Sequence, residues 1–139
     1  MIVPAYDAER YIGFTIESLL RQTHADLEII VVDDGSTDRT REIACRYAAA
    51  DSRVTVLAQR NAGVATARNR AIDVAKGEFL GFVDADDIWH PTAVAKMLAR
   101  FEGASPDLAV VYAWSTDIDE ENRPIGGVHV SRASGHVFP

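Results

Sequence analysis

Three aspartates lie within four residues directly after an apolar run, in Asp84-Ala85-Asp86-Asp87. The run itself, Phe79 to Val83, predicts a buried strand. Carboxylates at the end of a buried strand lose hydration and repel one another, and a cation would remove both penalties. Two carboxylates separated by one residue can bind a hard divalent ion, which takes further ligands from water and phosphate oxygens. The pattern predicts a metal–diphosphate site, with a helix N-cap cluster as the alternative.

Two other predicted strands also end in residues that suit a ligand. The first leads into Pro4-Ala5-Tyr6, and the second leads into Asp33-Asp34-Gly35-Ser36. Backbone groups fixed by Pro4 and the ring of Tyr6 suit a flat base, whereas Tyr6 is about equally well explained as a half-buried core residue. Asp34 can accept a hydrogen bond from a ring N–H, and a role in the turn is its alternative.

Further candidates lie near these strand ends in the predicted order of elements. Glu9 could face a ribose or interact with a helix dipole. Arg68 follows Gly63, which begins a predicted helix, and it could reach a phosphate or a site carboxylate. Asp84 could bind ribose hydroxyls or metal-bound water, and Asp86 is the best candidate for a direct metal ligand.

The elements that must position these residues alternate between strand and helix. This order predicts an α/β fold with a mostly parallel sheet flanked by helices on both faces. In such sheets ligands bind beyond the carboxyl ends of the strands, so one ligand could contact all three strand ends. Asp7 is expected to cap the first helix. The predicted strands are 1–3, 27–32, 54–57, 79–83 and 108–114, and helices are predicted over about 8–22, 36–50, 63–75 and 91–101. A turn over 123–127 is predicted to join the segments 116–119 and 128–130.

The composition restricts the classes of function. A chain of 139 residues with 47% hydrophobic residues can form a real core, and its net charge of -7 argues against nucleic acid as the main partner. Cys45 is the only cysteine, which excludes an intrachain disulfide and a cysteine-based zinc site, and the four histidines show no paired ligand spacing. No apolar run approaches the roughly 20 residues that span a bilayer, and no signal peptide is visible. These features predict a cytoplasmic protein.

With these residues in view, the chain resembles the nucleotide-binding half of a family-2 glycosyltransferase with a GT-A fold. The resemblance covers roughly residues 1–115, and four motifs occur in the family's order. Asp7 is a small departure, because the family more often has Asn there. The matching segments are Val3 to Glu9, Val31 to Asp38, Asn61 to Asn69, and Gly77 to Asp87.

The resemblance implies inverting transfer of a sugar from a nucleoside-diphosphate donor, most often UDP-linked, to an acceptor hydroxyl, with Mg²⁺ or Mn²⁺. It implies that Pro4, Tyr6 and Asp34 hold the base and that Asp84 lies near the ribose. The predicted metal ligands are Asp86 and Asp84. The predicted donor-binding residues are Pro4, Ala5, Tyr6, Glu9, Asp34, Gly63, Arg68, Asp84 and Ala85.

Both ends of the chain suggest a piece of a longer protein. Residues 1–115 are interpreted as the donor-binding core and 116–139 as the start of an acceptor-side region, so the fold is expected to be truncated before the acceptor-binding part. The catalytic base is expected beyond Pro139, because the acidic residues 117–121 fit a solvated turn. The fragment is expected to bind donor without transferring sugar to a saccharide or glycoconjugate, and the full-length protein could associate with the inner face of the membrane.

Two rival functions remain open from the sequence. One is a non-catalytic nucleotide-binding module. The other is a phosphatase that uses an Asp-x-Asp motif, although that class normally carries the motif after its first strand. A dinucleotide oxidoreductase is weaker still, because no G-x-G-x-x-G follows any predicted strand.

Overall fold

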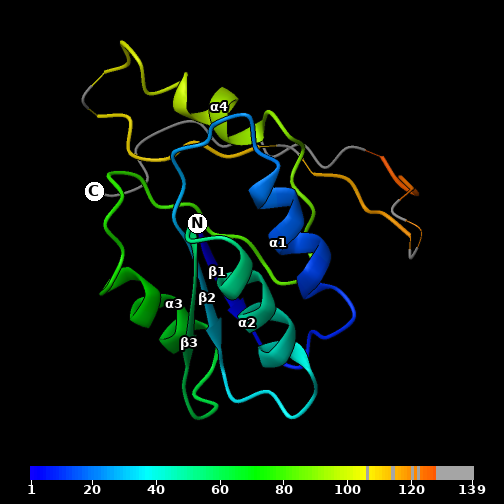
Figure 1. Cartoon of the computed structure of the whole chain (residues 1–139). Coiled ribbons are helices and arrows are strands. Elements are labelled where there is room, and N and C mark those ends of the chain that lie inside the picture. The colour runs from blue at the N-terminus through cyan, green and yellow to red at the C-terminus, as the bar shows by residue number, and fades with distance from the viewer. Residues whose placement is uncertain (106, 114, 120, 122, 128–139) are drawn as a thin grey trace. The chain divides into compact units, whose positions relative to one another are not determined.

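The computed structural model describes residues 1–105, 107–113, 115–119, 121 and 123–127. Packing divides the chain into two compact units, Met1–Lys96 and Met97–Pro139. The division between donor and acceptor regions after residue 115 stays a prediction. The elements are β1 (Ile2–Ala5), α1 (Ile12–Leu20), β2 (Ile29–Asp33), α2 (Thr40–Ala50), β3 (Val54–Ala58), α3 (Val64–Ile72) and α4 (Ala93–Leu98), as labelled in Figure 1.

Strands β1, β2 and β3 form a parallel sheet in that order, which confirms the predicted fold class. All five residues of β2 are buried, as expected for a β-branched, apolar strand in the middle of a parallel sheet. Ala5 pairs with Asp33, and Asp33 pairs with Ala58. The three strands therefore end at the same level, and the loops that follow them leave the same edge of the sheet.

Helices cover both faces of this sheet, with α1 and α2 on one side and α3 on the other (Figure 1). Successive strand residues point to opposite faces, so each strand contributes to two cores. The first core contains Val3, Ala5, Ile12, Ile16, Leu19, Ile29, Val31, Ala44 and Val54. The second contains Ile2, Ile30, Val32, Ala67 and Ala71.

The predicted buried strand 79–83 is wrong in this structure. The segment makes only an isolated bridge to β1, through hydrogen bonds from Ile2 N–H to the Gly81 oxygen and from Val83 N–H to the Ile2 oxygen, at 2.8 and 3.0 Å. Val83 is buried, whereas Leu80 and Phe82 remain 44% and 47% exposed. Gly81 in the middle of the run lowers its strand propensity, and apolar side chains stabilise a strand only where other residues cover them.

The first helix begins later than predicted, at Ile12, and Asp7 does not cap it. The residues between β1 and α1 instead form a loop, in which the N–H groups of Tyr11 and Ile12 both donate to the oxygen of Ala8. None of the helices in the described ranges is both long and apolar enough to cross a membrane.

In the second unit, residues 108–113 form no strand, contrary to prediction, and residue 114 lies outside the described residues. An antiparallel bridge joins Ile118 to Pro124, so the chain turns over 119–123 rather than 123–127. Asp119 accepts hydrogen bonds from the backbone N–H of Glu121 and Arg123 and pairs with the Arg123 guanidinium. The described contacts of Asp119 fit a turn residue, as the sequence indicated. The predicted strand 128–130 lies outside the described residues.

Candidate functional site

A cavity of about 320 Å³ lies beside the ends of β1 and β2. It combines the loop after β1, one residue after β2, the start of α3 and residues 84–87, which we call the acidic segment. Its lining residues are Pro4, Ala5, Tyr6, Asp7, Ala8, Tyr11, Asp34, Val64, Ala85 and Asp86. Pro4, Ala5, Tyr6, Asp34, Ala85 and Asp86 were singled out from the sequence, and the structure brings them to one place.

Two tyrosines contribute to the wall formed by the loop after β1. Tyr6 is 51% exposed, so its ring is available to a flat ligand rather than buried in the core. Tyr11 also lines the cavity and is 41% exposed. Sequence reasoning missed Tyr11 because it placed this residue inside the first helix, and a later helix start would have placed it in the loop.

Val64 is a second lining residue that the sequence did not indicate. It is an apolar residue of the helix predicted over 63–75, yet it is 52% exposed and borders the cavity. It is the first residue of α3, and its side chain is not part of the buried face of the helix that contains Ala67 and Ala71. Helical periodicity alone could not reveal this position.

Asp34 is buried, and its carboxylate holds the loop that leads into α3. Its Oδ1 accepts hydrogen bonds from Gln59 Nε2 at 2.7 Å and from Ala62 N–H at 2.9 Å, and its Oδ2 accepts one from Gly63 N–H at 2.8 Å. Burial alone would raise the pKa of Asp34, but these three hydrogen bonds hold the pKa below its usual value. The group is therefore a fixed negative charge at the cavity.

Gly35 allows this loop to pack closely against the turn after β2. Its φ is +76°, and a Cβ at this position would lie 2.8 Å from Asn61 N and 3.3 Å from the Gln59 oxygen. Gly63 also has a positive φ, with φ 88° and ψ 158°, a conformation that is essentially restricted to glycine. Gly63 directly precedes α3 and its N–H donates to Asp34, but it does not line the cavity.

Hydrogen bonds join the loop after β1 to the turn before α2, and we call these bonds the cross-loop network. Asp7 N–H donates to Ser36 Oγ, and Thr37 N–H donates to Asp7 Oδ1 at 2.7 Å. These bonds hold Asp7 at φ +47°, a left-handed conformation that is uncommon for a residue other than glycine. Because Asp7 lines the cavity, the network shapes its wall.

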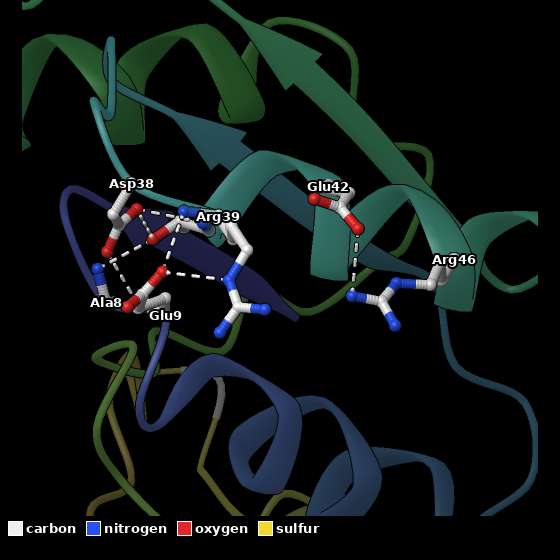
Figure 2. Close-up of polar contacts among 7 residues, drawn as sticks. Ala8, Glu9, Asp38, Arg39, Glu42 and Arg46 are labelled. Carbon is white, nitrogen blue, oxygen red and sulfur yellow. Dashed lines mark hydrogen bonds and ion pairs between the residues drawn. The ribbon is translucent and has the colours of Figure 1, made fainter.

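The cross-loop network continues through Asp38 and Thr40, as Figure 2 shows in part. The Asp38 carboxylate accepts from Glu9 N–H and from both the N–H and hydroxyl of Thr40. The buried hydroxyl of Thr40 in turn accepts from Ala8 N–H at 2.7 Å. Asp38 thus binds the first residue of α2 and ties it to the loop after β1.

Glu9 takes part in this network rather than in the cavity. Its Oε2 accepts a hydrogen bond from Arg39 N–H at 3.0 Å and lies 3.4 Å from Arg39 Nε (Figure 2). It does not line the cavity, so the structure gives no contact that would place it against a ribose. A role of Glu9 in donor binding stays a prediction.

The acidic segment carries three carboxylates with different surroundings. Asp84 Oδ1 lies 2.7 Å from Arg68 Nη2, so Arg68 reaches a site carboxylate, one of its two predicted partners. Asp86 is exposed and lines the cavity. Burial and then the charges of Asp84 and Asp86 raise the pKa of Asp87. The segment therefore concentrates negative charge beside the cavity.

The donor set of this segment fits a hard divalent ion. Carboxylate oxygens are the protein ligands that Mg²⁺ prefers, and that ion completes its shell with water and phosphate oxygens. Within the described ranges no group of three or more acidic, histidine or cysteine side chains is arranged to hold a metal alone. A metal at Asp86 would thus take its remaining ligands from a bound molecule or from water.

Comparison with known proteins places this geometry in context. The family model described as glycosyl transferase family 2 matches residues 1–131. A chondroitin synthase of Escherichia coli is 39% identical over 123 residues, which cover 88% of this chain and 18% of that protein.

Solved structures of glycosyltransferases share the fold. The crystal structure of residues 1–349 of Staphylococcus aureus TarS with UDP matches with a TM-score of 0.62 and 31% identity, over 73% of this chain and 31% of that one. The mannosyltransferase PcManGT of Pyrobaculum calidifontis, with GDP-Man and Mn²⁺, matches with a TM-score of 0.66 and 29% identity, over 76% of this chain and 32% of that one. The chain thus spans less than a third of the length of each of these three proteins.

Proposed function

The chain belongs to glycosyl transferase family 2, and from this premise we propose that the protein transfers a sugar from a nucleoside-diphosphate donor to a hydroxyl of a saccharide or glycoconjugate, with inversion at the anomeric carbon. The observation that carries the proposal is the shared cavity of Tyr6, Asp34 and Asp86, which come from the loops after β1 and β2 and from the acidic segment. The similar TarS and PcManGT structures contain UDP and GDP-Man respectively. A UDP-linked donor is the first choice to test.

The nucleobase is proposed to lie between the loop after β1 and Asp34. The exposed ring of Tyr6 supplies a stacking surface, and the Pro4 ring fixes the backbone beside it. Asp34 Oδ2 accepts one hydrogen bond, so it keeps capacity for a second from a base N–H. The depressed pKa of Asp34 keeps this oxygen an acceptor at neutral pH.

The diphosphate is proposed to lie at the acidic segment, with Mg²⁺ or Mn²⁺ held by Asp86 together with Asp84. When bound, such an ion stabilises the negative charge that builds on the leaving diphosphate. Arg68 pairs with Asp84, and its guanidinium is proposed to add a positive charge beside the same phosphates. None of the described residues is assigned as the base that deprotonates the acceptor, so residues 1–139 are proposed to bind donor without turnover.

Calorimetric titration of UDP and GDP, with Mn²⁺ and with EDTA, tests the donor site. We expect Mn²⁺ to tighten UDP binding and Asp86→Ala to weaken the Mn²⁺-dependent binding at least about tenfold, because a metal ligand is lost. Equal UDP affinity with and without metal, or an Asp86→Ala variant that binds as the wild type does, would contradict the proposal.

Asp26→Ala is the matched control. Asp26 is an exposed aspartate on the loop before β2 and does not line the cavity. The Asp26→Ala substitution removes the same charge from the protein as Asp86→Ala does. It therefore separates a general electrostatic effect from the loss of a metal ligand. We expect it to bind UDP with Mn²⁺ as the wild type does.

A further inference from the structure

Helix α1 carries three buried polar side chains on one side. Thr15, Ser18 and Gln22 follow the three- and four-residue spacing of a helix face, and they are 0%, 8% and 6% exposed. We call these three residues the α1 polar stripe. Buried polar groups are costly unless they form hydrogen bonds, so their partners reveal what the stripe does.

All three side chains bind the backbone of the acidic segment or of the residues after it. Thr15 Oγ1 donates to the Ala85 oxygen at 2.8 Å, and Trp89 N–H donates to Ser18 Oγ at 3.1 Å. Gln22 Nε2 donates to the His90 oxygen at 2.9 Å, and its Oε1 accepts from Val94 N–H at 3.1 Å. The stripe therefore follows the chain from residue 85 to residue 94.

The residues that the stripe holds have little secondary structure of their own. Residues 84–92 contain no helix or strand, and within the acidic triplet one turn bond joins Asp87 N–H to the Asp84 oxygen. The Ala85 carbonyl belongs to the peptide unit between Ala85 and Asp86. Because a peptide unit is planar, fixing that carbonyl also fixes the positions of the Asp86 N and Cα atoms, from which the Asp86 side chain extends.

We propose that Thr15 is a positioning residue for the acidic segment and that, through the Ala85 carbonyl, it holds Asp86 in the orientation that binds a divalent cation. The inference rests on the proposed function for the identity of the ion. Thr15 is fully buried and does not line the cavity, so it acts through Ala85 rather than by contact with a ligand.

The test compares Thr15→Val with the wild type in calorimetric titrations of UDP, each done with Mn²⁺ and with EDTA. Valine keeps the shape of threonine and removes the hydroxyl. We expect the Mn²⁺-dependent gain in UDP affinity to fall about threefold to tenfold, which is what the loss of one hydrogen bond corresponds to, while UDP affinity in EDTA stays unchanged. An unchanged Mn²⁺-dependent gain would overturn the proposal.

Two variants separate positioning from general stability. Thr15→Ser retains the hydroxyl and is expected to restore the Mn²⁺-dependent gain. Ser18→Ala removes another buried hydroxyl of the stripe without touching Ala85 and is expected to leave the gain near that of the wild type. A loss in Ser18→Ala equal to that in Thr15→Val would assign Thr15 a structural role only. If Thr15→Val does not fold, Thr15→Ala replaces it.

If the wild type shows no Mn²⁺-dependent UDP binding, the proposed function is contradicted. A second measurement then still tests the positioning role of Thr15. Amide hydrogen exchange in the nucleotide-free protein reports how firmly the segment is held. We expect Thr15→Val to speed exchange at Asp87, whose N–H donates to the Asp84 oxygen, more than Ser18→Ala does. Exchange at this amide as slow as in the wild type would overturn the positioning role.

Discussion

At the scale of single residues, Asp34 shows how a buried carboxylate can remain ionised. Burial favours the neutral acid, but the N–H groups of Gln59, Ala62 and Gly63 converge on its two oxygens and lower its pKa. A group whose pKa is lower in the folded state adds stability above its unfolded pKa of about 3.9. That contribution is lost as the pH falls through the folded-state pKa.

Asp34→Asn is expected to reduce the free energy of unfolding at pH 7 by about 1–3 kcal/mol, because an amide nitrogen would face buried N–H donors. The difference from the wild type should begin to shrink as the pH falls below the unfolded-state pKa of about 3.9, and it should shrink further toward the lower folded-state pKa, where Asp34 itself becomes protonated. Urea unfolding of both proteins from pH 3 to pH 7 measures this. A difference that does not change with pH would contradict the ionised state, and Asp26→Asn, an exposed change, serves as the control.

At the scale of elements, the loops after β1, β2 and β3 depend on one another. Asp34 binds the loop before α3, and Gly35 packs against the same loop because it has no side chain. The cross-loop network likewise joins the loop after β1 to the loop after β2 by hydrogen bonds. The cavity is therefore shaped by contacts between loops as much as by the strands that carry them.

Two glycine-to-alanine changes are expected to have opposite effects on stability. Gly35→Ala should destabilise the fold by at least about 1–2 kcal/mol, because its positive φ is unfavourable for alanine and its Cβ would meet the backbone of Asn61. Gly13→Ala, inside α1, should stabilise it by about 0.5–1 kcal/mol, since its Cβ would meet only ordinary contacts, the nearest being Tyr47 OH at 3.5 Å.

Urea unfolding at pH 7 gives both values. The Gly13 variant is the control for the chemical change itself. A loss of stability in both variants would contradict the assignment of Gly35 as a position that requires glycine.

The strands of the sheet could be predicted from sequence because their signal is local. The apolar run of β2 and the short apolar segments of β1 and β3 were located to within two residues. The run 79–83 has the same local signal and still forms no strand. A strand there would need other residues of the fold to cover its apolar side chains. Hydrophobic periodicity does not show whether the fold provides such residues.

The candidate site could be predicted in part for a related reason. Residues at strand ends converge in a parallel sheet by topology, so Tyr6 and Asp34 could be grouped without coordinates. Asp86 joins them although its predicted strand is absent, because the run before it is bridged in parallel to β1 at Phe82. The pairing of Glu9 with Arg39 and of Thr15 with Ala85 depends on how loops and helices pack. Such contacts join residues about 30 and 70 positions apart, for which a single sequence gives no signal.

At the scale of the molecule, the core lies within the first compact unit. Every residue of the described ranges that belongs to the two core clusters lies at or before Val83, and the polar stripe of α1 binds residues up to Val94. The first unit therefore contains the contacts that hold the cavity together.

A chain that ends at Gly103, which keeps α4 whole, is expected to unfold cooperatively with a Tm within about 5 °C of the 139-residue chain. Calorimetry of both chains measures this. A chain that ends at Lys76 is the control, since it lacks Val83 and all the backbone partners of the α1 polar stripe, and it is expected not to fold. A large drop in Tm for the chain that ends at Gly103 would contradict the independence of the first unit.

The cross-loop network also limits how this family member can evolve. Hydrogen bonds to Ser36 and Thr37 hold the backbone of Asp7 in its left-handed conformation. The Asp38 carboxylate accepts hydrogen bonds from both Glu9 N–H and Thr40 N–H. A substitution in one loop therefore removes a hydrogen-bond partner from the other loop unless a second substitution compensates. Among homologues, we expect positions 7–9 and 36–40 to co-vary as one inherited block.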